Sequence, residues 1–244
     1  MLVWPSRQKV LEVRLLMSEL VIAIPSLTRY DLLSRLCHVL DSDAAKVYPL
    51  KIVILDNGGG FLGSHFEKDI SQDCKNITVE LRTPEYNIGV AGSWNLFVRE
   101  YGQCIIANDD VTFSARSINA FLRASSSSPE TVIFENDDPV AGFGFSTFFV
   151  NDPSYWLSMG GFDELFNPAY FEDSDCRYRL RLIGRPALKV HLPDWSHDNS
   201  STLRTASKMH ERTHWCTFYR NRQYYILKWG GLPGKEKFKT PFVN

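Results

Sequence analysis

The sequence has few cysteines, no long apolar run and almost no net charge, and each of these absences argues against a class of protein. Its five cysteines, at positions 37, 74, 104, 176 and 216, are scattered and form no CxxC pair. This spacing argues against a disulfide scaffold and a cysteine-based zinc site, and it fits a reducing compartment. No apolar run approaches the ~20 residues that span a membrane. We therefore expect a cytoplasmic protein, with attachment to a membrane surface left open.

The net charge of -1 hides an uneven distribution. Residues 201–244 hold nine Lys or Arg and two Glu, which gives +7 for that segment and leaves -8 for the rest of the chain. Because the net charge is close to zero, the molecule as a whole is not an obvious binder of polyanions. A basic end suggests an anionic partner, and a solvated helix face is the alternative.

The length of 244 residues is that of one large domain or of a domain with an appendage. Residues 1–16 resemble neither a signal peptide nor a strand, and a second Met at position 17 begins the pattern MSELVIAIPS. We expect an N-terminal extension over 1–16, an α/β domain over 17–200, and a basic, aromatic, helical segment over 201–244.

Apolar strands and amphipathic helices alternate along the first half of the chain. The pattern predicts strands over 20–24, 51–55, 77–81 and 103–107, with helices after the first strand and over 91–102. Further on it predicts strands over 131–135, 144–150 and 186–192, and helices over 117–124, from 153, over 172–184 and over 203–228. Such alternation implies parallel strands with right-handed crossovers, hence an α/β fold with a mostly parallel central sheet flanked by helices.

Three polar stretches follow three of these strands directly. PSLTR follows the first, DNGGG the second, and NDD the strand over 103–107. In parallel sheets the ligand lies at the carboxyl ends of the strands, so the three stretches predict a nucleotide crevice. The adjacent carboxylates Asp109 and Asp110 repel each other, and either a capped turn or a divalent cation would explain them.

Five stretches, in this order, resemble family 2-type glycosyltransferases of the GT-A fold. They are VIAIPSLTRYDLL, KIVILDNGG, YNIGVAGSWN, CIIANDDV and GGFDELFNPAYFEDSDCRYRLRLIG, and they span residues 21–184. The resemblance implies a Rossmann-like domain with a nucleotide-sugar half over about 17–112 and an acceptor half over about 113–200. The implied activity is metal-dependent, inverting transfer of a hexosyl or pentosyl group from a nucleotide-sugar, UDP- or dTDP-linked, to a hydroxyl group.

The resemblance places NDD at the position of the family's DXD motif. Asp110 would be the main ligand of Mn2+ or Mg2+, and Asp109 would support it or meet the ribose. Asn108 stands where an Asp is commoner, and its amide can still bind a ribose hydroxyl. A hard cation with carboxylate ligands suits this chemistry because it neutralises the departing diphosphate. His197, in WSHDNSST, would be a further metal ligand, with His191 as the alternative.

The resemblance also assigns the nucleotide-sugar site. Asp56 would read the edge of the base, and Gly89 would let the backbone approach the nucleoside, although turn chemistry explains that glycine equally well. The remaining residues expected around the donor are Pro25, Ser26, Arg29, Asn57, Asn87 and Asn95.

Glu172 and Asp173 begin a predicted helix. Acids at a helix N-terminus cap it and favour its dipole, which is the simpler explanation. The resemblance implies that one of them is the general base that deprotonates the acceptor hydroxyl, and we expect Asp173 in that role with Glu172 second.

A competing motif is HERTH at positions 210–214, which matches the HExxH of zinc metalloproteases. A third ligand at the usual spacing is missing, and only Glu236 could replace it. The protease is therefore a remote alternative, and two histidines on an exposed helix face are the simpler interpretation.

The acceptor is less well defined. Aromatic side chains alternate with Lys and Arg in the C-terminal segment, and they can stack on sugars or bases or pack the helix onto the domain. We expect a glycan, a lipid-linked glycan or a modified nucleic-acid base as acceptor. A nucleotidyltransferase would need a GxG loop that PSLTR does not supply, and a non-catalytic carbohydrate- or nucleotide-binding domain stays an alternative.

Overall fold

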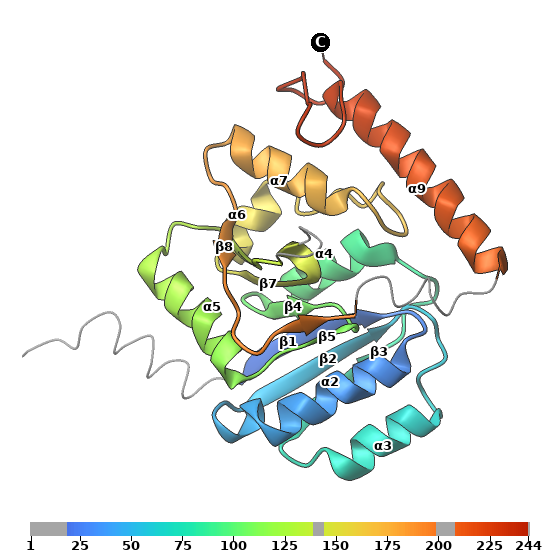
Figure 1. Cartoon of the computed structure of the whole chain (residues 1–244), viewed down its shortest axis with the longest axis vertical. Coiled ribbons are helices and arrows are strands. Elements are labelled where there is room, and N and C mark those ends of the chain that lie inside the picture. Colours follow the sequence, from blue (N-terminus) through green and yellow to red (C-terminus); the bar gives the residue numbers. More distant parts are fainter. Residues whose placement is uncertain (1–18, 139–143, 199–207, 244) are drawn as a thin grey trace, which may run out of the picture.

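The structure is a computed structural model that describes residues 19–138, 144–198 and 208–243, with the side chains of 208–213 outside the description. The N-terminal extension expected over 1–16 lies outside the described residues. Within them, strand–helix alternation produces the predicted α/β architecture (Figure 1).

Seven strands form the central sheet in the order β3-β2-β1-β4-β7-β6-β8. The pairs β1–β2, β2–β3, β1–β4 and β6–β8 are parallel, whereas β7 runs antiparallel to both of its neighbours. The prediction of a mostly parallel sheet is therefore confirmed. The strands are β1 (Leu20–Ser26), β2 (Leu50–Asp56), β3 (Ile77–Arg82), β4 (Ile105–Ala107), β6 (Ile133–Asn136), β7 (Thr147–Val150) and β8 (Leu188–Val190).

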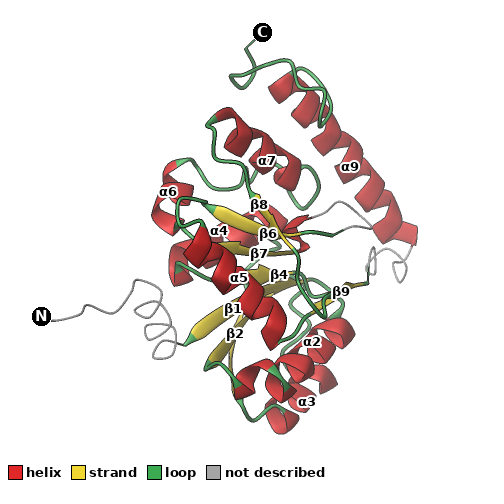
Figure 2. Cartoon of the chain, turned by 60° about the vertical axis from the view of Figure 1, so that its left-hand side comes forward, coloured by secondary structure: helices red, strands yellow, loops and turns green. Residues whose placement is uncertain are grey.

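Helices cover both faces of this sheet (Figure 2). On one face, Ile22 and Ile24 of β1 belong to the same apolar cluster as Leu36 of α2, and on the other face Ala23 packs with Trp94 of α4. Burial on both faces explains why the central strands β1, β2 and β4 are largely apolar runs, whereas β3 at the edge of the sheet is half exposed. The first face is covered by α2 (Tyr30–Ser42), α3 (His65–Asp73) and α5 (Ala115–Ser127), and the second by α4 (Gly89–Tyr101), α6 (Pro153–Ser158) and α7 (Glu172–Leu182).

Helix α3 was not predicted, although its start carries a capping box. The side chain of Ser64 accepts a hydrogen bond from the backbone N–H of Glu67 at 3.2 Å, as the S-x-x-E pattern provides. The helix buries only Ile70 fully, so it lacks the apolar periodicity by which helices are found. The strand expected over 144–150 begins at Thr147, because Gly144–Ser146 form a short 3-10 turn. A second such turn, Ala44–Lys46, follows α2.

The C-terminal helix α9 (Lys208–Trp229) packs against α7 and the loop before it. Tyr225 and Trp229 are buried there with Phe166. The ammonium group of Lys228 lies 2.6 Å from a carboxylate oxygen of Asp163 and 2.7 Å from one of Asp175. One of the nine basic residues of the C-terminal segment, Lys228, is thus neutralised by ion pairs inside the protein. It contributes nothing to the surface charge.

This buried cation yields a stability prediction. Lys228→Met keeps most of the side-chain volume but leaves Asp163 and Asp175 without their shared counter-ion, so we expect a loss of about 3 kcal/mol in the free energy of unfolding. The exposed Lys237→Met is the matched control and should change stability by less than about 0.5 kcal/mol. Urea unfolding of both variants measures the difference, and equal stabilities would show that the ion pairs do not hold α9 in place.

Candidate active site

A short antiparallel ladder at the end of β4 brings two of the predicted metal ligands together. After β4 ends, β5 (Val111–Thr112) pairs with β9 (Ser196–His197), with Val111 opposite His197. The backbone N–H of Asp198 donates to the carbonyl of Asp110 at 2.8 Å. As a result, Nε2 of His197 lies 3.2 Å from Oδ1 of Asp110, although the two residues are far apart in the sequence.

A third residue, Asp138, completes this cluster and was missed in the sequence. Its Oδ2 lies 3.2 Å from Nδ1 of His197, on the opposite side of the ring from Asp110, and its side chain is 1% exposed. Asp138 ends a second NDD tripeptide, residues 136–138, which begins on the last residue of the buried strand β6, whereas the first NDD follows β4 directly. The same signal that selected Asp110 could therefore have found it.

The two carboxylates decide the protonation of His197. Burial lowers the pKa of this imidazole, but the hydrogen bonds and charges of Asp110 and Asp138 outweigh that effect, so its pKa is raised above the ordinary 6.5. The two carboxylates thus favour the protonated imidazole, whose positive charge would offset part of theirs. A cation bound there would take over that role and displace the proton.

Asp109 points toward β1 rather than toward His197. The hydroxyl of Ser26, at the end of β1, donates to Oδ2 of Asp109 at 2.6 Å. Burial raises the pKa of Asp109 to about 7, the Ser26 hydrogen bond opposes this shift, and the charge of Asp110 adds to it. Arg29 lies close enough for its charge to favour the ionised form. Its guanidinium is paired with Asp31 through contacts of 2.9 and 2.7 Å.

These groups suit a divalent cation, although no cluster of three His, Cys, Asp or Glu side chains within the described residues is already arranged as a metal site. Asp110 offers a hard oxygen ligand and His197 a nitrogen ligand. Asp138 holds the other ring nitrogen of His197, as carboxylates do behind many metal-bound histidines. Two protein ligands leave the remaining positions for a diphosphate and water, which is the arrangement that Mg2+ and similar ions favour in nucleotide sites.

Asp56 and Asn57 lie at the neighbouring strand end, but both shape loops. The buried carboxylate of Asp56 accepts a hydrogen bond from the Tyr30 hydroxyl at 2.7 Å and others from the backbone N–H groups of residues 58 and 59 in the DNGGG loop and of residue 61 just after it. Asn57 donates to the Ser93 hydroxyl at 2.9 Å and accepts from the backbone N–H of Ile88 at 3.1 Å. A nucleobase could reach Asp56 only by replacing one of these donors.

Asn87, Gly89 and Asn95 also have partners within the protein. Asn87 accepts from the backbone N–H of Gly89 at 2.8 Å, which forms the turn before α4. A side chain at Gly89 would meet the carbonyl oxygen of Pro168 at 2.8 Å, and its φ of 75° is a conformation that favours glycine. The Asn95 amide exchanges two 2.8 Å hydrogen bonds with the backbone of Phe162. These contacts position the GGFDE loop, so any contact of the three residues with a donor stays a prediction.

Asp173 and Glu172 differ sharply in their surroundings. Asp173 accepts from the backbone N–H of Ser174 at 2.6 Å and pairs with Nη1 of Arg177 at 3.3 Å. Arg177 in turn binds Glu135 of β6 at 2.9 Å. Glu172 is 6% exposed, and its Oε2 has no hydrogen-bond partner within the described residues. Burial, and then the charge of Asp173, raise the pKa of Glu172 well above the ordinary 4.5.

The backbone that leads into α7 is constrained at this point. Tyr170 and Phe171 both have positive φ angles, 84° and 74°, which non-glycine residues adopt at a cost of about 1–3 kcal/mol each. Helix α9 holds the strained segment: Asn221 donates to the carbonyl of Ala169 at 2.7 Å and to that of Tyr170 at 3.3 Å. The C-terminal helix therefore fixes the place where Glu172 and Asp173 enter the site.

A series of ion pairs connects the surroundings of Asp173 with those of His197. Asp173 contacts Arg177, and Arg177 contacts Glu135 on β6. Asp138, shortly after the end of β6, contacts His197, which contacts Asp110. The predicted base therefore contacts, through Arg177, a residue near the end of β6. The predicted metal ligand His197 contacts Asp138, shortly after the end of the same strand.

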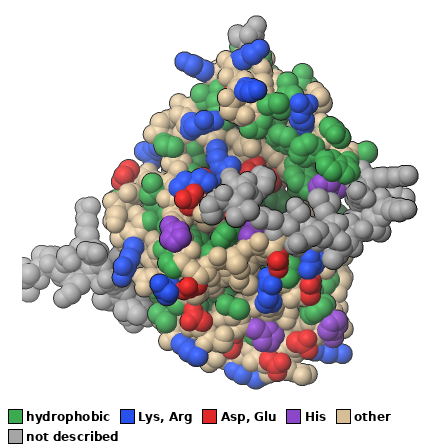
Figure 3. Space-filling view, viewed as in Figure 1, with side chains coloured by type: hydrophobic (Ala, Val, Ile, Leu, Met, Phe, Trp, Pro, Cys, Tyr) green, Lys and Arg blue, Asp and Glu red, His purple; other side chains and the backbone are tan. Residues whose placement is uncertain are grey.

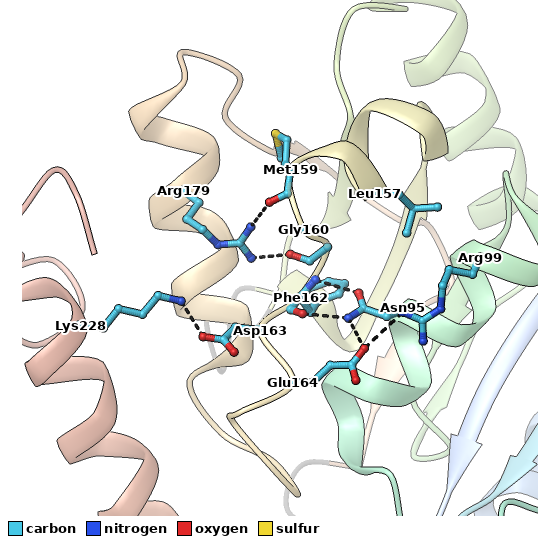
Figure 4. Close-up of a pocket in the computed structure, with 11 residues that line it drawn as sticks. Asn95, Arg99, Leu157, Met159, Gly160, Phe162, Asp163, Glu164, Arg179 and Lys228 are labelled. Carbon is cyan, nitrogen blue, oxygen red and sulfur yellow. Dashed lines mark hydrogen bonds and ion pairs between the residues drawn. The ribbon is translucent and has the colours of Figure 1, made fainter. Parts of the chain in front are cut away.

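A pocket lies beside the GGFDE loop, residues 160–164 (Figure 4). It has a volume of about 570 Å³ and does not include Asp110 or Asp173. Its charged side chains already have partners of opposite charge: Asp163 pairs with Lys228, Glu164 with Arg99 at 3.3 Å, and Arg179 with Asp175 at 2.8 Å. Since these charges are already matched, the hollow reflects how the loop is held between α4, α7 and α9.

The HERTH motif receives no support from its described part. His210 and Glu211 lie outside the residues with described side chains. Nδ1 of His214 lies 2.7 Å from the Tyr170 hydroxyl, which ties this ring to the loop before α7. His191 is likewise not placed in the Asp110 cluster, where His197 is found.

The state of Glu172 leads to a pH prediction. Below the ordinary pKa of 4.5, Glu172 is protonated in both the folded and the unfolded chain and has no effect on the pH dependence. Above it the unfolded chain ionises first, so the contribution of Glu172 to wild-type stability falls as pH rises. Relative to wild type, Glu172→Gln should therefore gain up to about 1.4 kcal/mol in unfolding free energy per pH unit until the folded pKa is reached.

Urea unfolding at about pH 5 and about pH 8 measures this difference. The exposed Glu130→Gln serves as control and should show no such trend. A constant difference between Glu172→Gln and wild type across this range would contradict the buried, protonated state of Glu172.

Comparisons with known proteins find similarity in structure alone. No family model matches the sequence, and a search of curated proteins finds no match. Among solved structures, the mannosyltransferase PcManGT from Pyrobaculum calidifontis, in complex with GDP-Man and Mn2+, superposes with a TM-score of 0.56 at 13% identity. The match covers 73% of this chain and 56% of that one.

Two further structures give the same result. The 1–349 fragment of S. aureus TarS in complex with UDP-GlcNAc has a TM-score of 0.52 at 9% identity, covering 78% of this chain and 62% of that one. GalNAc-T7 with UDP, GalNAc and Mn2+ has a TM-score of 0.57 at 11% identity, covering 86% and 50%. This chain thus spans 50–62% of the lengths of the three structures. At such low identity, these structural matches show the architecture alone. On that basis the chain has the GT-A glycosyltransferase fold.

Proposed function

We propose that this protein is a metal-dependent, inverting glycosyltransferase that uses a nucleotide-sugar donor. The observation that carries the proposal is the 3.2 Å contact between Asp110 and His197 at the carboxyl end of β4, with Asp138 behind the histidine. A GT-A sheet binds its donor at this edge. The similar structures carry GDP-Man, UDP or UDP-GlcNAc, and two of them carry Mn2+, which supports the donor class.

Asp110 and His197 would hold the Mn2+ or Mg2+ ion, and Asp138 would keep the histidine ring oriented with Nε2 toward it. When bound, such a cation neutralises the charge that develops on the departing nucleoside diphosphate. Asp109 and Ser26 lie beside this position, where the carboxylate can accept a hydrogen bond from a ribose hydroxyl. Arg29 adds a positive charge on the β1 side that favours phosphate. We propose a UDP- or dTDP-linked sugar as donor.

Asp173 would act as the general base for the acceptor hydroxyl. Arg177 and the N–H of Ser174 orient this carboxylate, and Glu135 fixes Arg177. Burial and the charge of Asp173 raise the pKa of Glu172, which favours its neutral form, and a neutral Glu172 would lower the negative charge around Asp173. A base that takes the hydroxyl proton as the oxygen attacks the anomeric carbon, from the side opposite the diphosphate, gives an inverted product.

The metal site predicts a graded series of variants. In a thermal-shift screen of UDP-, dTDP-, GDP- and CMP-sugars, we expect one nucleotide to raise the melting temperature only when Mn2+ is present, by mass action. Asp110→Asn should abolish this shift. Asp138→Asn, which changes only the group behind His197, should weaken Mn2+ affinity about 10–100-fold. Asp69→Asn, at an exposed position of α3, should match wild type.

A lack of any nucleotide response, with or without metal, would favour a non-catalytic carbohydrate-binding domain instead. A response that survives Asp110→Asn unchanged would place the donor elsewhere.

The assignment of Asp173 as general base predicts a loss of transfer activity without a loss of donor binding. Asp173→Asn should lower the rate of sugar transfer about 10²–10⁴-fold while the Mn2+-dependent thermal shift stays intact. Glu172→Gln, which mimics the protonated side chain, should keep a rate within about tenfold of wild type. Transfer and donor hydrolysis measured on both variants decide the assignment, and the reverse order of losses would make Glu172 the base.

A further inference from the structure

The outer side of α9 is apolar although it faces solvent. One side of this helix is buried on the domain through Tyr225 and Trp229. On the other side, Trp215, Tyr219 and Leu227 are 47%, 58% and 67% exposed. A surface helix usually turns polar residues outward, so an apolar outer side marks a surface that contacts something else.

The apolar surface continues into the segment that follows α9. Phe242 and Val243 are both more than half exposed. The backbone N–H of Phe242 donates to the carbonyl of Lys228 at 2.8 Å, which fixes this segment beside the end of the helix. Figure 3 shows hydrophobic side chains gathered over α9 at the upper right of the molecule, with basic side chains near its top.

The charge on this surface has one sign. Residues 214–243 contain six Lys or Arg and a single acid, Glu236. Glu236 contacts Tyr225 and Arg181, and its side chain is almost fully buried. Lys228 forms ion pairs with Asp163 and Asp175. The cations left outside are Arg220, Arg222, Lys235, Lys237 and Lys239, with no exposed carboxylate side chain between 214 and 243.

We propose that this C-terminal face, formed by Trp215, Tyr219, Leu227, Phe242 and the cations just named, binds an anionic lipid membrane. Trp and Tyr favour the boundary between lipid headgroups and acyl chains, and aliphatic side chains enter the acyl region. Lys and Arg beside them are attracted to anionic headgroups by about 1 kcal/mol each. In Figures 1 and 2, α9 lies at the edge of the molecule, where a flat surface can approach it.

The composition of the face separates this partner from two others. A second copy of the chain that contacted the same face would bring two positively charged surfaces together. Like charges repel each other, which opposes that contact. Nucleic acid would satisfy the cations, but such interfaces are polar and leave no use for Leu227 or Val243. An anionic membrane accepts the aliphatic, aromatic and basic side chains together. The proposal does not depend on the donor site.

The test is vesicle co-sedimentation of the full chain. We expect binding to vesicles of phosphatidylcholine and phosphatidylglycerol in equal amounts, weak binding to phosphatidylcholine alone, and a loss of binding as salt rises. Combined Lys235→Glu, Lys237→Glu and Lys239→Glu should reduce binding about 100-fold or more. Leu227→Ser should reduce it about fivefold, whereas Leu62→Ser, at an equally exposed position after β2, should leave it unchanged.

Cys216 provides a second readout, because the other four cysteines are buried. An environment-sensitive dye on Cys216 should shift its emission to the blue when anionic vesicles are added. Equal binding to both vesicle types, no binding to either, or an unchanged affinity of the charge-reversed variant would overturn the proposal. Tight binding to a DNA or RNA oligonucleotide without vesicle binding would overturn it in favour of nucleic acid.

Discussion

The account depends on the short ladder between β5 and β9, because it joins two parts of the chain that the sequence keeps far apart. Two residue pairs, Val111 with His197 and Thr112 with Ser196, set the register. A shift of one residue would turn His197 to the opposite side of its strand and away from Asp110. With the register observed, the imidazole lies between Asp110 and Asp138, with one carboxylate beside each ring nitrogen, and this is the place where we propose that a cation binds.

The second constraint comes from the C-terminal segment. Helix α9 is tied to the domain by Lys228, which neutralises Asp163 and Asp175, and by Asn221, which holds the strained backbone before α7. The helix that carries Glu172 and Asp173 is therefore positioned from two directions, by β6 through Arg177 and by α9. Helix α9 also exposes apolar and basic side chains on its other side, and this is the surface that we propose for membrane attachment.

Much of the fold and part of the site could be predicted from the sequence, for reasons that particular residues show. Buried strands such as 51–55 have local signals, and the acids after β4 drew attention because carboxylates are rare at the end of an apolar run. Asp138 follows β6 in the same way but was missed, since sequence spacing does not reveal that β6 lies near β9. Asp56 and Asn95 were expected at the donor, and the structure uses both to hold loops. The same polar groups serve either purpose, and only contacts distinguish them. Lys228 was counted as surface charge for a similar reason.

The measurement that tests the central claim most directly is anomalous scattering from manganese in crystals grown with Mn2+ and the nucleotide that stabilises the protein. The account predicts one strong peak within about 2.5 Å of a carboxylate oxygen of Asp110 and of Nε2 of His197, with the diphosphate completing the coordination. A manganese peak remote from Asp110, or a nucleotide bound there with His197 still paired to both carboxylates and no metal between, would contradict it.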